Sequence, residues 1–299
     1  MSAPGWVDHL LRWVLVSRGY TSRTVDTSVG PVHLLGRAGA GTLPPVLLVH
    51  GFGAAASQWA PLVRALQPHV RSVWAIDLPG HGFSRSTARG WSSHPRAALT
   101  LDTLRDGVIE ALDRLHADEP DAGPAVVVGN SLGGAVALRY VHARPDRALG
   151  VHLLSPGGAP MTPDELAAVQ AVFRVNTHRE ATAFLDRLYG RPNGWINHLM
   201  APLVRRVFRD PALHGLLAQV TDADWLTPDE VRTVPRPIRV SWGKNDRILP
   251  SAAVAFWRAH LPPGAELAEP DDDGHVPQLA APGRTASELL AFVRRCQRN

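Results

Sequence analysis

Short runs of consecutive apolar residues recur along the chain, and longer stretches with helical spacing separate them. Apolar runs without polar alternation are typical of strands that are buried on both faces in a parallel sheet. Such strands are predicted over Val46–Val49, Val70–Ile76, Ala125–Val128, Val151–Leu154, Ile238–Trp242 and Ala265–Glu269. Earlier in the chain, Thr24–Asp26 and Val32–Leu35 flank Gly30-Pro31 and predict a hairpin.

The stretches between these runs place apolar residues three or four positions apart. Leu101, Leu104 and Val108 follow this spacing, which puts them on one face of a helix. Helices are predicted over Ser57–Leu66, Leu99–Leu115, Leu132–Ala143, Ala252–His260 and Ala286–Arg295. Strands that alternate with helices favour an α/β fold whose parallel strands are joined by right-handed crossovers.

One long segment, residues 156–234, breaks this alternation. It shows helical patterning at Leu166–Val175 and Ala181–Leu188, and it contains no convincing strand. We therefore expect a helical lid or cap at residues 156–234, inserted into an α/β core that comprises residues 1–155 and 235–299.

The N-terminal residues 1–19 predict an amphipathic helix. The segment is apolar, but it contains charged residues and lacks the basic opening and the small-residue cleavage site of a signal peptide. Two interpretations stay open. The helix packs on the body of the protein, or it is a membrane-surface anchor that uses Trp6, Leu10 and Trp13.

Composition excludes several classes of protein. The chain has 299 residues with 45% hydrophobic and 19% charged residues, an ordinary globular mixture. Its net charge is only +4, and no run of Lys or Arg exceeds two residues, which argues against a nucleic-acid partner. No apolar run reaches the roughly 18 residues of a membrane span. The single cysteine, Cys296, cannot form an internal disulfide, and we expect a cytoplasmic protein, either free or at a membrane periphery.

The motif that carries chemistry is Gly129-Asn130-Ser131-Leu132-Gly133. It lies between a predicted strand and a predicted helix, so it is a Gly-x-Ser-x-Gly pattern in a strand–turn–helix context. A serine at such a sharp turn has a strained backbone and an exposed hydroxyl. Because a serine hydroxyl is a poor nucleophile at neutral pH, it needs a base that an acid orients.

Candidates for the acid and the base follow later strands. Asp246 comes directly after Ile238–Trp242, and His275 comes after the run that ends at Glu269. The order serine, acid, histidine is the one expected for this architecture. The neighbouring run Asp271-Asp272-Asp273 offers rival acids, although a solvated loop is the simpler interpretation of it.

Two backbone amides are candidates for an oxyanion hole. His50-Gly51-Phe52-Gly53 follows the strand Val46–Val49, and it offers the N–H of Phe52. The second donor is the N–H of Leu132, directly after Ser131. We expect His50 to be a structural residue that holds this loop.

These segments, together with Asp77-Leu78-Pro79-Gly80-His81-Gly82-Phe83-Ser84, resemble the α/β-hydrolase superfamily, and bacterial lipases, esterases and monoacylglycerol-lipase-like enzymes in particular. The resemblance spans about residues 46–277. It implies a mostly parallel eight-stranded sheet with helices on both faces and a lid. It also implies Ser131 as nucleophile, Asp246 as acid and His275 as base.

The expected activity is that of a serine hydrolase that cleaves carboxylic esters through an acyl-enzyme and needs no metal or organic cofactor. An apolar acyl ester, such as a monoacylglycerol, is the expected substrate. The alternative is carbon–carbon bond hydrolysis of meta-cleavage products, which are vinylogous diketones. Two departures from those enzymes oppose it: Gly53 is followed by Ala54, and His275 is followed by Val276. A non-enzymatic receptor or scaffold is a second rival.

Overall fold

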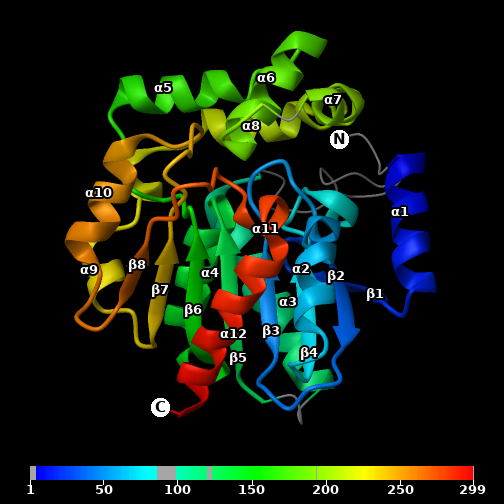
Figure 1. Cartoon of the computed structure of the whole chain (residues 1–299), viewed down its shortest axis with the longest axis vertical. Helices are drawn as coiled ribbons and strands as arrows, with labels where there is room; N and C mark the ends of the chain where they lie inside the picture. The colour runs from blue at the N-terminus through cyan, green and yellow to red at the C-terminus, as the bar shows by residue number, and fades with distance from the viewer. Residues whose placement is uncertain (1–4, 86–98, 120–122, 193, 299) are drawn as a thin grey trace.

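The computed structural model describes residues 5–85, 99–119, 123–192 and 194–298, and its centre is an eight-stranded sheet (Figure 1). The strands are β1 (Thr21–Thr27), β2 (Gly30–Ala38), β3 (Val46–Val49), β4 (Ser72–Ile76), β5 (Ala125–Asn130), β6 (Ala148–Leu154), β7 (Ile238–Ser241) and β8 (Glu266–Ala268). Their order in the sheet is β1-β2-β4-β3-β5-β6-β7-β8. Only the β1–β2 and β2–β4 pairings are antiparallel. The expected mostly parallel eight-stranded α/β sheet is confirmed.

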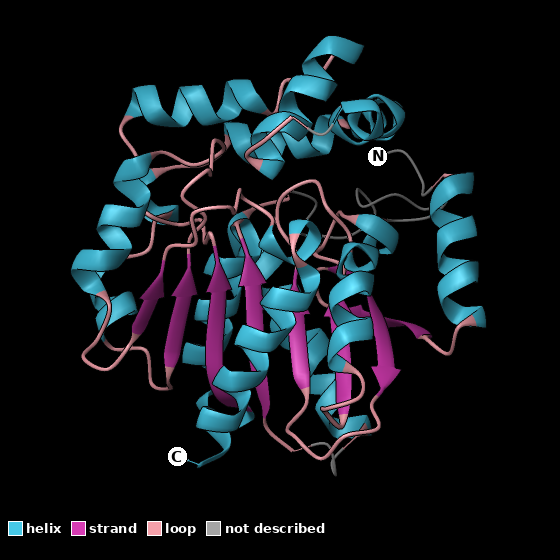
Figure 2. Ribbon diagram, in the orientation of Figure 1, coloured by secondary structure: helices cyan, strands magenta, loops and turns pink. Residues whose placement is uncertain are grey.

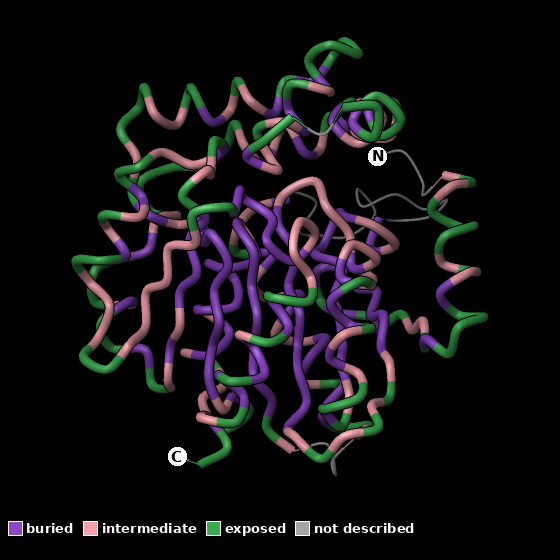
Figure 3. The backbone as a smooth tube through the Cα atoms, viewed as in Figure 1, coloured by how far each residue is buried: buried purple, intermediate pink, exposed green. Residues whose placement is uncertain are grey.

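Helices cover both faces of this sheet (Figure 2). The helices are α1 (Trp6–Ser17), α2 (Ala60–Leu66), α3 (Leu101–Asp118), α4 (Leu132–Ala143), α5 (Pro163–Val172), α6 (His178–Tyr189), α7 (Gly194–Phe208), α8 (Pro211–Ala218), α9 (Pro228–Arg232), α10 (Ser251–His260), α11 (Pro277–Ala280) and α12 (Pro282–Arg298). Successive strand residues serve opposite faces. Leu47 and Val49 belong to the core shared with α3 and α4, whereas Val46 and Leu48 belong to the core shared with α2 and α12. This two-sided burial is why the strands have no polar alternation, and Figure 3 shows their central parts buried.

The first hairpin forms, but its turn lies earlier than the sequence predicted. Ser28 and Val29 make the turn, and Gly30 already pairs with Thr27. Pro31 lies opposite Asp26 inside the ladder. A proline is tolerated there because β2 pairs with β4 only from Leu34 onward, so this end of the strand has an open edge.

A helical insertion, residues 155–237, connects β6 to β7 and contains α5 to α9. Helices α5 to α8 lie above the carboxyl ends of the parallel strands (Figure 1). Three of its helices begin with a Thr-x-x-Glu capping box, at Thr162, Thr177 and Thr227, where the threonine accepts a hydrogen bond from the glutamate N–H. The local sequence of the insertion therefore specifies where these three helices begin.

The insertion also has its own apolar cluster, which includes Phe173, Phe184 and Phe208. Leu188 is partly buried and packs against this cluster. Trp195 of α7 lies outside this cluster, and the residue is 74% exposed. Helical spacing places a residue on a face, but it does not say which face meets the protein.

Candidate active site

Ser131 occupies a strained turn between β5 and α4. Its backbone has φ 53° and ψ −126°, a conformation that L residues rarely adopt, and Ser131 is the N-cap residue of α4. A Cβ at Gly129 would lie 2.3 Å from the Gly133 carbonyl oxygen, and a Cβ at Gly133 would lie 2.3 Å from the His50 carbonyl oxygen. Both glycines are therefore required by the close approach of the helix to the strands.

The turn is anchored through its main chain. The Ser131 N–H donates to the Leu154 carbonyl (3.1 Å), and the Ser131 carbonyl accepts from the N–H groups of Gly134 and Gly157 (both 2.8 Å). These bonds connect the turn to the end of β6 and to the start of the insertion. The serine side chain is consequently held at the carboxyl edge of the sheet.

His275 and Asp246, predicted from different loops, lie in direct contact. The His275 Nδ1 lies 2.7 Å from the Asp246 Oδ2, and both side chains are almost fully buried. The other carboxylate oxygen accepts hydrogen bonds from the N–H groups of Ile248 (2.9 Å) and Leu249 (3.2 Å). The main-chain N–H of His275 donates to the Leu188 carbonyl in the insertion.

The electrostatics of this pair favour an ionised carboxylate. Burial alone would raise the pKa of Asp246, but the His275 charge and hydrogen bond and the two backbone amides outweigh it, so the pKa lies below its usual value. A carboxylate accepts the Nδ1–H of His275, which leaves the Nε2 of the imidazole as the atom with a free lone pair.

The rival acids are placed elsewhere. Asp273 forms an ion pair with Arg284, and Asp271 forms one with Lys244 (2.6 Å). Among Asp246, Asp271 and Asp273, it is Asp246 that contacts His275.

Asn130 is a contributor that the motif analysis missed. Its side-chain amide donates to the Leu154 carbonyl (2.9 Å) and to the His275 carbonyl (3.0 Å), and its oxygen accepts from Gln278 (2.9 Å). Asn130 and Gln278 are both buried. The variable position of a Gly-x-Ser-x-Gly motif gives no signal for such a role, because its partners lie far along the chain.

The loop that contains Phe52 is held by a buried polar network. His50 donates from Nδ1 to the Gly51 carbonyl (2.8 Å), and its Nε2 accepts from the N–H of Leu78 (3.1 Å). Burial lowers the pKa of His50, so the imidazole is neutral, as these two bonds require. This geometry agrees with the expected structural role of His50.

Asp77 stands at the centre of the same network. Its carboxylate accepts hydrogen bonds from the N–H groups of Ala56 (2.6 Å) and Phe83 (3.0 Å), and from Nδ1 of His33 (2.7 Å). Nearby, burial lowers the pKa of His81 to about 3, and its ring contacts that of Phe52 edge to face.

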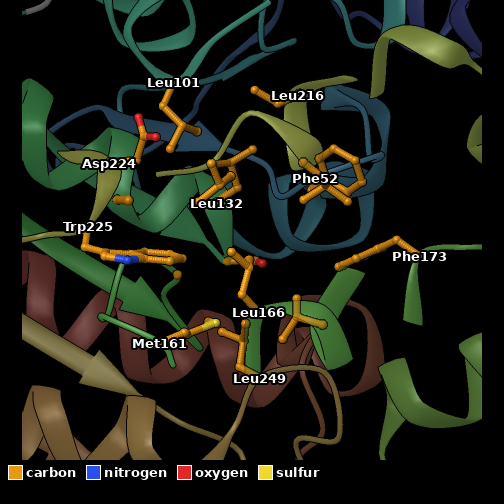
Figure 4. Close-up of a pocket in the computed structure, with 17 residues that line it drawn as sticks. Phe52, Leu101, Leu132, Met161, Leu166, Phe173, Leu216, Asp224, Trp225 and Leu249 are labelled. Carbon is orange, nitrogen blue, oxygen red and sulfur yellow. The ribbon is translucent and has the colours of Figure 1, made fainter. Parts of the chain in front are cut away.

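Two cavities meet above Ser131. The Trp225 cavity, of about 100 Å³, is lined by Ser131, Phe52 and Leu132 and extends to Asp224 and Trp225 (Figure 4). The His275 cavity, of about 250 Å³, is lined by Ser131 and His275 and by apolar side chains of α6 and α7. Four residues of the predicted site therefore line one or both cavities: Phe52, Ser131, Leu132 and His275. The fifth, Asp246, lies behind His275 and contacts its ring.

Within residues 5–85, 99–119, 123–192 and 194–298, no three His, Cys, Asp or Glu side chains gather closely enough to hold a metal ion. No helix in those same ranges is both long and apolar enough to cross a bilayer.

Comparisons with known proteins agree with this fold. A family model described as the alpha/beta hydrolase family matches residues 46–288. A pimeloyl-acyl-carrier-protein methyl ester esterase of Aromatoleum aromaticum is 29% identical over 271 residues, which cover 84% of this chain and 98% of that protein. A 2-hydroxymuconate semialdehyde hydrolase of a Pseudomonas species is 28% identical over 83% of this chain and 86% of that protein.

A third relative is the dihydrolipoyllysine-residue acetyltransferase component of an acetoin cleaving system from Pseudomonas putida, 29% identical over 84% of this chain. The chain spans 64% of the length of that protein. Among solved structures, a bacterial membrane phospholipase A superposes with a TM-score of 0.77 and 21% identity, covering 98% of this chain and 92% of the other. At that identity the superposition shows a shared fold and nothing finer.

Proposed function

Because the chain belongs to the alpha/beta hydrolase family, we propose that it hydrolyses carboxylic esters with Ser131 as nucleophile, His275 as base and Asp246 as orienting acid. The observation that carries this proposal is the contact of 2.7 Å between His275 and Asp246 beside a cavity that Ser131 also lines. Residues 156–234 are assigned as a lid over this site.

The chemistry follows from the geometry. His275 takes the Ser131 proton on Nε2 while the hydroxyl oxygen bonds to the ester carbonyl carbon, and Asp246 stabilises the imidazolium. The N–H groups of Phe52 and Leu132 receive the oxyanion, and each such donor contributes about 3 kcal/mol to the transition state. The alcohol leaves with the proton from His275. Water then attacks the acyl-enzyme with the same base, and the acid is released.

Carbon–carbon bond hydrolysis is the second candidate, and the Pseudomonas relative that is named as a semialdehyde hydrolase raises it. The substrates of that reaction carry a carboxylate, which needs a cationic partner when it is buried. No Arg or Lys is among the described residues that line either cavity, and Arg174 and Arg179 of the insertion are exposed. This absence of countercharge favours the ester.

The proposal is tested with a fluorophosphonate probe and p-nitrophenyl acetate. Ser131→Ala is expected to abolish both labelling and turnover. Ser155→Ala is the matched control, since Ser155 also has a positive φ and a buried hydroxyl with no hydrogen-bond partner among the described residues. Full labelling of the Ser131 variant would refute the mechanism.

We also propose contact with an anionic membrane surface through α1 and α7. The large hydrophobic side chains most exposed in the described part of the chain all lie on these two helices, among them Trp6 (76%), Trp13 (67%) and Leu199 (67%). The helices are joined where Arg206 packs on Gly5 and lies 3.8 Å from Asp8. Exposed tryptophan and leucine beside arginine are typical of interfacial helices.

The charged residues of α1 and α7 indicate which lipids the two helices would contact. Within their bounds the two helices carry Arg12, Arg205 and Arg206 against a single acidic residue, Asp8. Such a surface favours anionic lipids.

Sedimentation with phosphatidylglycerol vesicles tests this contact, and phosphatidylcholine vesicles provide the comparison. Leu10→Ser is expected to weaken binding. Leu11→Ser is the control, because it also removes an exposed leucine but lies about 140° around the helix from Trp6. Equal losses from both variants, or no binding to either lipid, would contradict the proposal.

A further inference from the structure

The two cavities are separated directly above the nucleophile. Phe52 and Phe173 line both of them, and their rings contact each other edge to face with centroids 4.9 Å apart. Phe208, which lines the His275 cavity, packs against this pair, with its ring centroid 5.5 Å from that of Phe173. In Figure 4, Phe52 and Phe173 lie at one end of the Trp225 cavity, and Asp224 and Trp225 lie at the other. Because Ser131 also lines both cavities, a substrate bound there can extend one half into each of them.

The position of His275 decides which half of the ester enters which cavity. In ester cleavage, the proton on His275 must reach the departing alcohol oxygen, so that oxygen must lie within hydrogen-bond reach of the imidazole. His275 lines one cavity only, and so do its neighbours Val276 and Leu279. The alcohol half accordingly begins in the His275 cavity. The acyl half points away from the base, past Leu132, into the Trp225 cavity.

The two cavities differ in size. An apolar cavity of about 150 Å³ holds one benzene ring, so about 100 Å³ corresponds to roughly four carbons and about 250 Å³ to roughly ten. Leu185, Leu188, Val204 and Val207 make the larger cavity strongly apolar.

From these observations, and resting on the proposed ester hydrolysis, we propose that the preferred substrates are short-acyl esters of bulky apolar alcohols. The acyl group occupies the Trp225 cavity and the alcohol occupies the His275 cavity. A monoacylglycerol, expected from the sequence, has the opposite form, because its long chain is acyl and its alcohol is small and polar. The sizes of the two cavities and the position of His275 therefore indicate a smaller class of substrates than apolar esters in general.

Constitutional isomers test the assignment without changing overall hydrophobicity. Decyl acetate and ethyl decanoate have the same formula and differ only in which side of the ester carries the long chain. A pH-indicator assay that follows acid release measures kcat/KM for both. Decyl acetate is expected to be preferred by about tenfold or more, a ratio in the range that a few misplaced methylenes produce. Equal rates, or a preference for ethyl decanoate, would overturn the proposal.

Substitutions at two matched valines test which cavity holds the acyl half of the ester and which holds the alcohol half. Val220 lines only the Trp225 cavity and Val204 lines only the His275 cavity, and both are half-buried. Val220→Phe is expected to lower kcat/KM for ethyl butanoate relative to ethyl acetate by about tenfold, with little effect across acetates of longer alcohols. Val204→Phe is expected to do the reverse. If the two effects are exchanged, the acyl and alcohol assignments are wrong.

Fluorophosphonate labelling of each variant shows whether it is folded and active. If either phenylalanine variant fails to label, Val220→Leu and Val204→Leu replace it, with the same expected directions. Failure of ester hydrolysis itself would appear as no labelling and no turnover in the wild-type protein. Failure of this inference alone would appear as a labelled, active enzyme with the wrong isomer preference.

Discussion

The side-chain amide of Asn130 donates a hydrogen bond to the main-chain carbonyl of His275 over 3.0 Å. This contact joins the residue before the nucleophile to the loop that carries the base, two points 145 residues apart in the chain. Gln278 closes the arrangement by donating to the Asn130 oxygen. The relative position of serine and histidine therefore depends on one buried amide as well as on the sheet.

Replacing Asn130 with Asp should be more harmful than replacing it with Ala. An ionised carboxylate cannot donate to the two carbonyls and would face them with a buried charge, whereas Ala only leaves them unpaired. We expect Asn130→Ala to lower the free energy of unfolding by about 1–3 kcal/mol and Asn130→Asp by more. Urea unfolding at pH 7 measures both. If the two variants are equally stable, the amide does not act as described.

Replacing Asp246 with Asn should remove most activity without unfolding the protein. The neutral amide no longer fixes the imidazole tautomer or stabilises its cation, and kcat is expected to fall on the order of 10³–10⁴-fold. Asp271→Asn is the control, since the Asp271 side chain is exposed and forms a surface ion pair with Lys244. Turnover of p-nitrophenyl acetate, normalised to labelled Ser131, checks this. A loss below tenfold would speak against Asp246 as the acid.

Replacing Asp77 with Asn should destabilise the protein in a pH-dependent way. Burial would raise the pKa of Asp77, but His33 and the amide of Ala56 hold it below its usual value. A lowered pKa in the folded state means that the carboxylate stabilises the fold above its ordinary pKa of 3.8, and that this stabilisation is lost as pH falls through the lowered value.

We therefore expect Asp77→Asn to cost about 3 kcal/mol at pH 7 and progressively less below about pH 4. The free energy of unfolding, measured between pH 3 and pH 8, tests this. Asp229→Asn, at an exposed position, should change it little throughout. A cost for Asp77→Asn that is independent of pH would contradict the ionised role of this residue.

Replacing Gly133 with Ala should be destabilising although Ala is the better helix former. The new methyl would lie 2.3 Å from the His50 carbonyl oxygen and 2.4 Å from that of Val49, both of them backbone atoms that cannot move aside easily. The expected loss is about 1–3 kcal/mol. Gly283→Ala is the control, because no described atom outside the local helix backbone lies within 4 Å of the methyl that it would add. This variant should be neutral or stabilise the protein by up to about 1 kcal/mol. Thermal unfolding compares the two.

Local sequence was sufficient to predict most of the elements. The strand Val46–Val49 has the predicted bounds, because a short continuous apolar run fits a parallel strand that is buried on both faces. The helix Leu132–Ala143 also has its predicted bounds, since Ser131 and the glycines around it define where the strand ends and the helix begins. The hairpin turn was displaced because Pro31 looked like a turn residue but lies on an open strand edge.

The sequence by itself determined the residue types and their order: a serine at a strand–helix turn, then an aspartate, then a histidine, each after a buried strand. Only the tertiary structure decided that Asp246 rather than Asp273 meets His275, that Asn130 joins the two loops, and that Trp195 faces outward. It also decided that two cavities of unequal size meet at Ser131. The physical reason is that helical and strand periodicity act over a few residues. The contacts of His275 instead join positions 29 and 145 residues apart, and the exposure of Trp195 depends on which face of a helix the rest of the protein covers.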